Sequence, residues 1–176
     1  MSGNINDKQA AENWQSRKSH YPNLDVLIQP EEYILARLPP TSPLPPTILN
    51  LLSKPASDAS ASFCTVSRTH RELSILVSTS SSRSWTDFEA ELETVDGEQD
   101  GYGTDGPWRA FRIRGPMEFH LVGVLLEFGK CLAERSISIF AVSTWDTDYI
   151  CVKEADFTNA CQALKEDGWN VLDQAD

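Results

Sequence analysis

The residues best suited to chemistry in this chain are a polar run, Ser-Thr-Trp-Asp-Thr-Asp at 143–148, and a short loop that follows Gly115-Pro116. The polar run supplies hydroxyls, carboxylates and an indole. A loop that leads into a helix exposes backbone N–H groups and the positive end of the helix dipole. Together these groups suit a zwitterion such as an amino acid. Its carboxylate would meet the amides, and Asp148 would pair with its ammonium or guanidinium group.

Hydrophobic patterns on either side place both segments in one α+β unit. The expected elements are a strand at 108–114, a helix at 119–134, strands at 137–142 and 149–153, a helix at 155–167 and a strand at 169–172. The apolar stripe of the first helix is Leu121, Leu125, Phe128 and Leu132. We expect Asp156 or Glu154 to cap the second helix and Gly168 to end it. The β-α-β-β-α-β order is ferredoxin-like, and it brings the polar turn beside the loop that starts the first helix.

The first half of the chain has a weaker pattern. We expect a flexible tail at 1–22, one or two strands at 26–28 and 33–38, and a stiff proline-rich bend at 39–46. We then expect a short helix through Leu52, with Thr47 as its cap, and a hairpin of 63–67 with 72–77. Residues 80–107 are rich in serine, glycine and acidic residues, which predicts a mobile linker with a transient helical turn at 85–92.

A family resemblance rests on two stretches of the second half. Gly-Pro-Met-Glu-Phe-His-Leu-Val-Gly-Val-Leu at 115–125 and Ile-Ser-Ile-Phe-Ala-Val-Ser-Thr-Trp-Asp-Thr-Asp-Tyr-Ile-Cys-Val-Lys-Glu at 137–154 resemble the ACT domains of the CASTOR-type family. Residues 63–76 resemble the hairpin of a partner ACT unit. The resemblance implies an α+β fold with two ferredoxin-like βαββαβ units packed side by side, a degenerate first unit at 23–79 and a second unit at 108–176. The animal relatives are cytosolic arginine sensors, so the implied role is amino-acid binding with allosteric regulation.

In ACT pairs, as the resemblance implies, an effector binds at the interface between two units, next to the first strand-to-helix loop. The residues that would contact it are Met117, Glu118, Phe119, Ser143, Thr144, Trp145 and Asp148. Trp145 would cover the ligand or stack on a cationic side chain. Arginine or lysine is the first expectation for the ligand. We expect a homodimer, because sheets of this kind leave edges exposed, and a regulatory protein partner downstream.

Composition excludes several classes of protein. The net charge is −11, and residues 86–107 contain eight acidic residues but no Lys or Arg, so a basic nucleic-acid-binding face is excluded. The apolar runs are too short for a membrane span and the N-terminus has no signal-peptide core, so we expect a cytoplasmic protein. The four cysteines, Cys64, Cys131, Cys151 and Cys161, lack metal-site spacing, and we expect buried, reduced thiols with no metal or cofactor.

Other functions remain open at this point. The turn at 143–148 is built from ordinary turn-forming residues, and Trp145 would equally serve as a dimer anchor. An enzyme that has recruited the same pocket would use acid–base candidates among Asp148, His120, Glu118 and His70. A protein-interaction scaffold without a ligand would work through sheet edges, the proline-rich bend and the acidic segment. We expect no catalytic set, because no nucleophile–base spacing is present.

Overall fold

The computed structural model describes residues 14, 16–18, 20–53, 63–79, 82–93, 103–117 and 122–173. These residues form two compact units. The inserted unit runs from Glu31 to Trp108. The split unit comprises the residues up to Pro30 together with those from Arg109 onward. The expected α+β fold with antiparallel sheets and ferredoxin-like units is confirmed.

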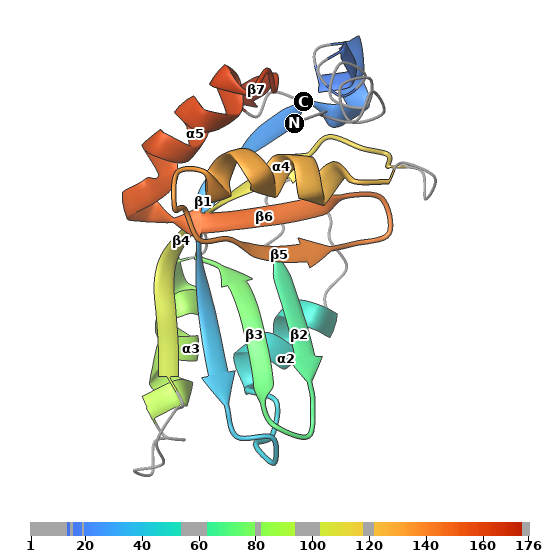
Figure 1. Ribbon diagram of the computed structural model, residues 1–176. Helices are drawn as coiled ribbons and strands as arrows, with labels where there is room; N and C mark the ends of the chain where they lie inside the picture. Colours follow the sequence, from blue (N-terminus) through green and yellow to red (C-terminus); the bar gives the residue numbers. More distant parts are fainter. Residues whose placement is uncertain are drawn as a thin grey trace. The chain divides into compact units, whose positions relative to one another are not determined.

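The inserted unit has the order strand, helix, strand, strand, helix, strand (Figure 1). It uses part of β1 (Val26–Leu38), α2 (Pro46–Ser53), β2 (Cys64–Arg68), β3 (Leu73–Ser78), α3 (Ser82–Glu93) and part of β4 (Gly103–Ile113). The strand order is β2-β3-β1-β4, with Leu38 opposite Leu73 and Cys64 opposite Val77. The expected hairpin is therefore confirmed, and the two short strands expected at 26–28 and 33–38 are one strand.

Helix α3 lies in the segment that the sequence suggested as a mobile linker. Its Phe88 is fully buried in the core of the inserted unit, beside Ile48 and Ile75. Glu91 accepts hydrogen bonds from the backbone N–H of Thr47 at 3.1 Å and from its hydroxyl at 2.8 Å. The many acidic residues give this segment a composition typical of disorder. Burial of Phe88 and the hydrogen bonds between Glu91 and Thr47 nevertheless stabilise the helix. Helix α2 begins at Pro46, so Thr47 lies inside it rather than capping it.

The split unit contains the remaining elements (Figure 1). They are η1 (Pro22–Leu24), the start of β1, the end of β4, α4 (Val124–Ala133), β5 (Phe140–Ser143), β6 (Asp148–Lys153), η2 (Glu154–Asp156), α5 (Phe157–Glu166) and β7 (Val171–Asp173). The strand order is β5-β6-β4-β1, and β7 pairs in parallel with β1 through Val26 and Val171. Residues 26–30 of β1 thus belong to this unit, whereas the sequence placed them in the first unit.

Helix α4 begins at Val124, and the predicted start at 119 is wrong. Gly123 precedes it in a left-handed conformation with φ of 87°, which a glycine adopts without steric cost. The buried face is Val124, Phe128, Cys131 and Leu132. Leu125 is 37% exposed, so the predicted core stripe is wrong at that position, and Leu121 lies outside the described residues.

Helix α5 ends as the sequence predicted, with Gly168 at φ of 91° donating its N–H to the Lys165 carbonyl at 3.1 Å. Asp156 occupies the N-cap position but forms no side-chain capping bond. Aromatic rings join the helices to the sheet of the split unit. Phe111 of β4 stacks on Phe157 with centroids 5.2 Å apart, and Phe128 meets Trp169 at 5.4 Å. This packing holds the end of β4 against α4 and α5.

Candidate functional site

The polar turn and the loop after β4 lie side by side in the split unit, as the sequence predicted. The N–H of Met117 donates to the carbonyl of Asp146 at 2.7 Å. The hydroxyl of Thr147 donates to the carbonyl of Ile113, the last residue of β4. Gly115 approaches so closely that a Cβ there would lie 2.7 Å from the Asp146 carbonyl oxygen. We call the paired segments, Gly115–Met117 and Ser143–Asp148, the loop–turn site.

The other side of the loop is held by residues that the sequence reasoning missed. The N–H of Gly115 donates to the carbonyl of Asn23 at 2.9 Å, and the Asn23 amide donates to the Pro116 carbonyl at 3.2 Å. Asp25 accepts from Arg114 at 3.2 Å and from Asn170 at 2.8 Å. These residues lie far from the loop in sequence, so the chain pattern alone carried no signal of their role.

Asp148 is the distinctive residue of the loop–turn site. Only 7% of it is exposed, and its position on β6 places it on the same face as Ile150 and Val152, which are core residues. Its side chain forms no hydrogen bond or ion pair with another described residue. A carboxylate removed from water costs free energy unless a partner compensates for its charge. The oxygens of Asp148 are not fully enclosed, so the carboxylate remains accessible to a cationic group.

The other predicted contacts differ in how accessible they are. Trp145 is 79% exposed at the tip of the turn, and Ser143 is exposed at the end of β5. Thr144 donates its N–H and its hydroxyl to the Thr147 carbonyl, at 2.8 and 2.9 Å, so its side chain can offer a ligand only an acceptor. Met117 is half-buried against the core of the split unit. Glu118, Phe119 and His120 lie outside the described residues.

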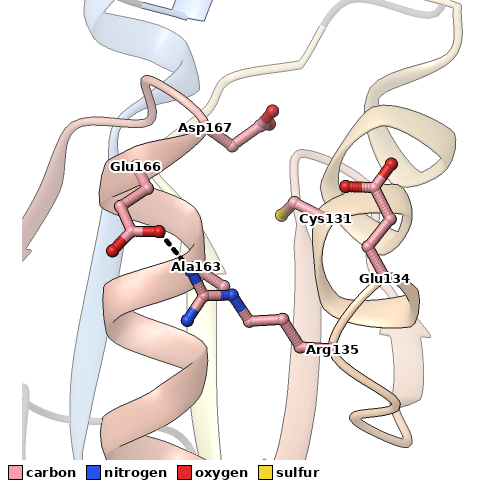
Figure 2. A pocket seen from close by; sticks show the side chains of 6 residues that line it. All are labelled: Cys131, Glu134, Arg135, Ala163, Glu166 and Asp167. Atoms are coloured by element: carbon pink, nitrogen blue, oxygen red, sulfur yellow. Dashed lines mark hydrogen bonds and ion pairs between the residues drawn. The ribbon is translucent and has the colours of Figure 1, made fainter.

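A second polar feature is a groove of about 360 Å³ between the C-terminal ends of α4 and α5. Figure 2 shows its lining, in which Arg135 reaches across to pair with Glu166. Arg135 also donates to Asn159 at 3.0 Å. Cys131 lines this groove, and burial raises the pKa of its thiol to about 11. A thiol with such a pKa is protonated at neutral pH and is a poor nucleophile.

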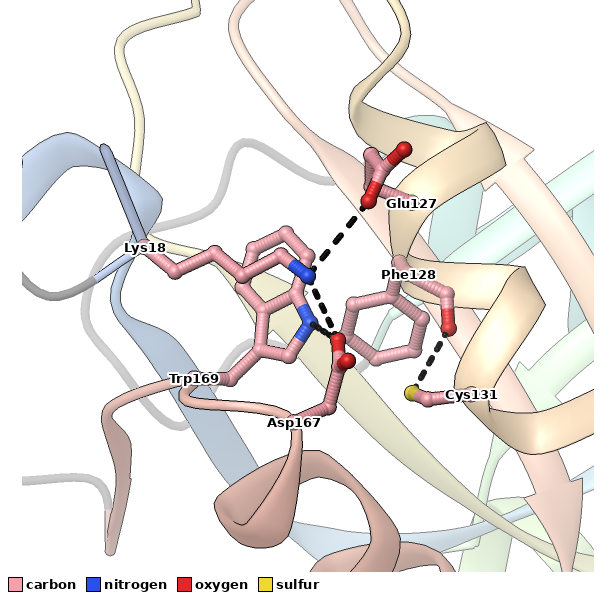
Figure 3. A network of polar contacts seen from close by, with 6 residues as sticks. All are labelled: Lys18, Glu127, Phe128, Cys131, Asp167 and Trp169. Carbon is pink, nitrogen blue, oxygen red and sulfur yellow. Dashed lines mark hydrogen bonds and ion pairs between the residues drawn. The ribbon is translucent and has the colours of Figure 1, made fainter. Parts of the chain in front are cut away.

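A third feature is a polar network around Lys18, which belongs to the segment that the sequence predicted as a flexible tail. Figure 3 shows its ammonium group between two carboxylates, at 2.6 Å from Asp167 and 3.4 Å from Glu127. The ammonium also lies 5.3 Å from the ring centroid of Trp169, whose Nε1 donates to Asp167 at 3.1 Å. Lys18 is 3% exposed, so this part of the segment is packed against the split unit.

Within the described part of the chain, no group of three or more His, Cys, Asp or Glu side chains is arranged to hold a metal ion. The same residues include no helix long and apolar enough to cross a membrane. All four cysteines are free thiols; Cys131 and Cys151 are buried and Cys64 and Cys161 are half-buried.

This architecture is similar to that of known proteins. Residues 104–166 match the family model of the ACT domain, and both segments of the loop–turn site lie within the matched stretch. A search of curated proteins found no match.

Solved structures share the fold over most of the chain. Protein Atu0741 from Agobacterium tumefaciens is similar, with 24% identity, a TM-score of 0.60, and coverage of 86% of this chain and 94% of that one. The regulatory subunit of aspartate kinase from Thermus thermophilus gives 12% identity, a TM-score of 0.54, and coverage of 80% and 95%. The corresponding subunit from Thermus flavus has 11% identity and a TM-score of 0.53. The match covers 81% of this chain and 96% of that one. These likenesses show the fold of tandem ACT regulatory domains.

Proposed function

We propose that this protein is a regulatory amino-acid-binding protein whose ligand contacts the loop–turn site. The observation that carries the proposal is Asp148, which is only 7% exposed and whose carboxylate has no polar partner among the described residues. A ligand ammonium or guanidinium group would pair with it. The class of protein agrees with the structural likeness to regulatory subunits of aspartate kinase, which are named for a regulatory role.

The ligand would lie with its cationic end toward Asp148 and beside Trp145, whose ring is 79% exposed. Trp145 would then stack on a cationic side chain. Arginine and lysine are the first ligands to test, because the CASTOR-type resemblance and the acidic chain both favour a cation. Met117, Glu118, Phe119, Ser143 and Thr144 complete the proposed contact set. We further propose that a second ACT unit supplies the opposite wall, that the protein works in the cytoplasm as a homodimer, and that ligand binding changes how it meets a regulatory partner.

The test is a thermal-shift screen of the twenty amino acids against three forms of the protein: wild type, Asp148→Asn and Asp146→Asn. Asp146 is the matched control because it lies in the same turn, is exposed and undergoes the same loss of charge. A ligand at a hundred times its dissociation constant adds about 2.7 kcal/mol of stability. We expect one or two cationic amino acids to stabilise wild type and Asp146→Asn but not Asp148→Asn.

Two results would contradict the proposal. The first is that no amino acid at millimolar concentration shifts the melting temperature of the wild type. The second is that Asp148→Asn responds as strongly as Asp146→Asn, because the carboxylate would then not contact the ligand. Turnover of the ligand in the same samples, followed by mass spectrometry, would instead support the enzyme alternative.

A further inference from the structure

The polar network around Lys18 has the chemical groups of a binding site for an alkylammonium ion. The Lys18 Nζ lies 2.6 Å from Asp167 and 3.4 Å from Glu127 (Figure 3). It also lies 5.3 Å from the ring centroid of Trp169. Two carboxylates and an indole ring are groups that recognise an ammonium ion where water is excluded, and Lys18 is only 3% exposed. We call Glu127, Asp167 and Trp169 the ammonium site.

Contacts within the split unit hold the ammonium site in place without help from Lys18. The Trp169 Nε1 donates to Asp167 at 3.1 Å, and the Trp169 ring packs edge-on against Phe128 with centroids 5.4 Å apart. Asp167 directly follows α5, where the negative end of the helix dipole favours a cation. If Lys18 withdraws, the site therefore keeps its shape and its charge, and it favours a second cation in the same place.

The ammonium site adjoins the groove between the C-terminal ends of α4 and α5. Asp167 belongs to both, and the groove has a volume of about 360 Å³ (Figure 2). The other acids of its lining are Glu134 and Glu166. Its one cation, Arg135, pairs with Glu166, whereas Glu134 is exposed and forms no ion pair with another described residue. The groove thus extends the negative charge of the ammonium site.

The size and charge of the groove fit a linear polyamine. A volume of about 360 Å³ holds a small molecule but not a folded element of a partner protein. Three acids against one paired cation favour a ligand that carries more than one positive charge. The alkyl chain between two ammonium groups would lie against Ala163 and Cys131, which complete the lining.

Lys18 reaches the ammonium site from the N-terminal segment, which is also attached to the split unit by Trp14. A ring carbon of Trp14 lies 3.5 Å from the position that a Cβ at Gly123 would take. Gly123 is the N-cap of α4 and Glu127 lies in its first turn, so the segment holds the start of this helix at two points. An ammonium group that replaced Lys18 would remove one of these two attachments.

From these observations we propose that the ammonium site and the adjoining groove bind a polyamine, and that Lys18 is the intramolecular ligand that fills the site when no polyamine is bound. A bound polyamine displaces Lys18 and releases the N-terminal segment from the start of α4. The ammonium site shares no residue with the loop–turn site, so this proposal does not depend on amino-acid binding there.

The first experiment asks whether the site binds an ammonium group once Lys18 is shortened. Lys18→Ala removes the three methylene groups and the nitrogen that n-propylammonium would supply. At ten times its dissociation constant, n-propylammonium should raise the melting temperature of this variant by about 3–6 °C. The wild type should not respond, because Lys18 fills its site. 1-Propanol, which has no charge, and Lys165→Ala, shortened at an exposed lysine of α5, are the controls.

The second experiment follows spermidine binding by titration calorimetry at physiological salt and does not depend on the folding of Lys18→Ala. Spermidine should bind the wild type, and Asp167→Asn should weaken that binding at least about 10-fold, because a charged partner of the ammonium group is lost. Asp173→Asn, at an exposed carboxylate outside the groove, is the matched control. Lys18→Ala should bind at least about 10-fold more tightly than the wild type, because no intramolecular ammonium has to leave first.

Limited proteolysis of the wild type tests the displacement itself. Saturating spermidine should allow cleavage near residues 14–20 at a protease concentration that leaves the ligand-free protein intact. Spermidine binding without this cleavage would overturn the displacement of Lys18.

Two other results would overturn the site. One is a melting temperature of Lys18→Ala that responds to n-propylammonium no more than that of the wild type. The other is spermidine binding that Asp167→Asn leaves unchanged, since the attraction would then come from the acidic surface in general. Asp148→Asn should bind spermidine as the wild type does, so failure here is distinguished from failure of the loop–turn site.

Discussion

The backbone N–H of Met117 donates to the carbonyl of Asp146 at 2.7 Å, and this bond joins the loop after β4 to the turn between β5 and β6. Because Thr147 also donates to the Ile113 carbonyl, the two segments are tied at both ends. A ligand that moves the loop must therefore move the turn, or break these bonds. Such coupling would link the proposed binding event to the start of α4.

Gly115→Ala should destabilise the protein by roughly 2 kcal/mol and weaken ligand binding. The residue has φ of 72°, and an added Cβ would lie 2.7 Å from the Asp146 carbonyl oxygen. Urea denaturation measures the loss. Gly103→Ala is the control, since Gly103 also has a positive φ but no atom lies within 4 Å of its Cβ position. Equal effects at the two sites would show that the close approach at Gly115 does not matter.

Asp148→Asn should slightly raise the stability of the ligand-free protein, by less than about 1 kcal/mol, while abolishing binding of a cationic ligand. The substitution keeps the size of the side chain and removes a charge that is largely shielded from water and has no partner among the described residues. The free energy of unfolding in urea is the measurement. Asp146→Asn should change it by less than about 0.5 kcal/mol, because that residue is exposed. A clear loss of stability in Asp148→Asn would mean that the carboxylate is already paired in the free protein.

Lys18→Met should loosen the N-terminal segment and lower stability by about 2 kcal/mol. The substitution keeps an apolar stem against Trp169 but removes the charge that Asp167 and Glu127 share at 2.6 and 3.4 Å. Limited proteolysis should then cut near residues 14–20 at a protease concentration that leaves the wild type intact. Lys165→Met, on the exposed side of α5, is the control. Unchanged proteolysis would show that packing of Trp14 alone holds the segment.

Glu91→Ala should destabilise the inserted unit by about 1 kcal/mol. Its carboxylate accepts from the N–H and the hydroxyl of Thr47 at the start of α2, where backbone donors lack partners in the helix. Chemical denaturation followed by circular dichroism measures this. Glu89→Ala, an exposed glutamate on the same helix, should have little effect. Equal losses in the two variants would refute a capping role for Glu91.

The buried thiols should react slowly and should make stability depend on alkaline pH. Burial raises the pKa of Cys64 to about 11 and that of Cys151 to about 12, from an ordinary value of 9.0. The folded state therefore favours the neutral thiol, and its contribution to stability is present below pH 9 and is lost as the pH rises toward 11 or 12. Iodoacetamide at pH 8 should label all four cysteines in urea and spare Cys151 in the folded protein. Rapid labelling of folded Cys151 would contradict this.

Local patterns in the sequence determined much of the split unit. Alternating apolar residues identified the strands at the end of β4 and in β6, and Gly168 correctly marked the end of α5. The polar run between β5 and β6 and the Gly-Pro loop were correctly expected to be neighbours, because the ferredoxin-like order fixes which connections share one end of a sheet. The reason is that periodicity and turn chemistry act over a few residues and are visible in any single chain.

Long-range contacts decided the rest. The left-handed Gly123 moved the start of α4 from 119 to 124, and a buried Phe88 turned part of an acidic segment into helix α3. Other features also depend on residues far apart in the chain. Strand β1 is divided between two units, Asn23 and Asp25 support the loop after β4, and Lys18 packs on Asp167. The sequence by itself shows that Asp148 is polar and lies at a predicted turn. Only the tertiary structure decided that it is buried, because burial depends on which strands and helices surround a residue and not on its neighbours in sequence.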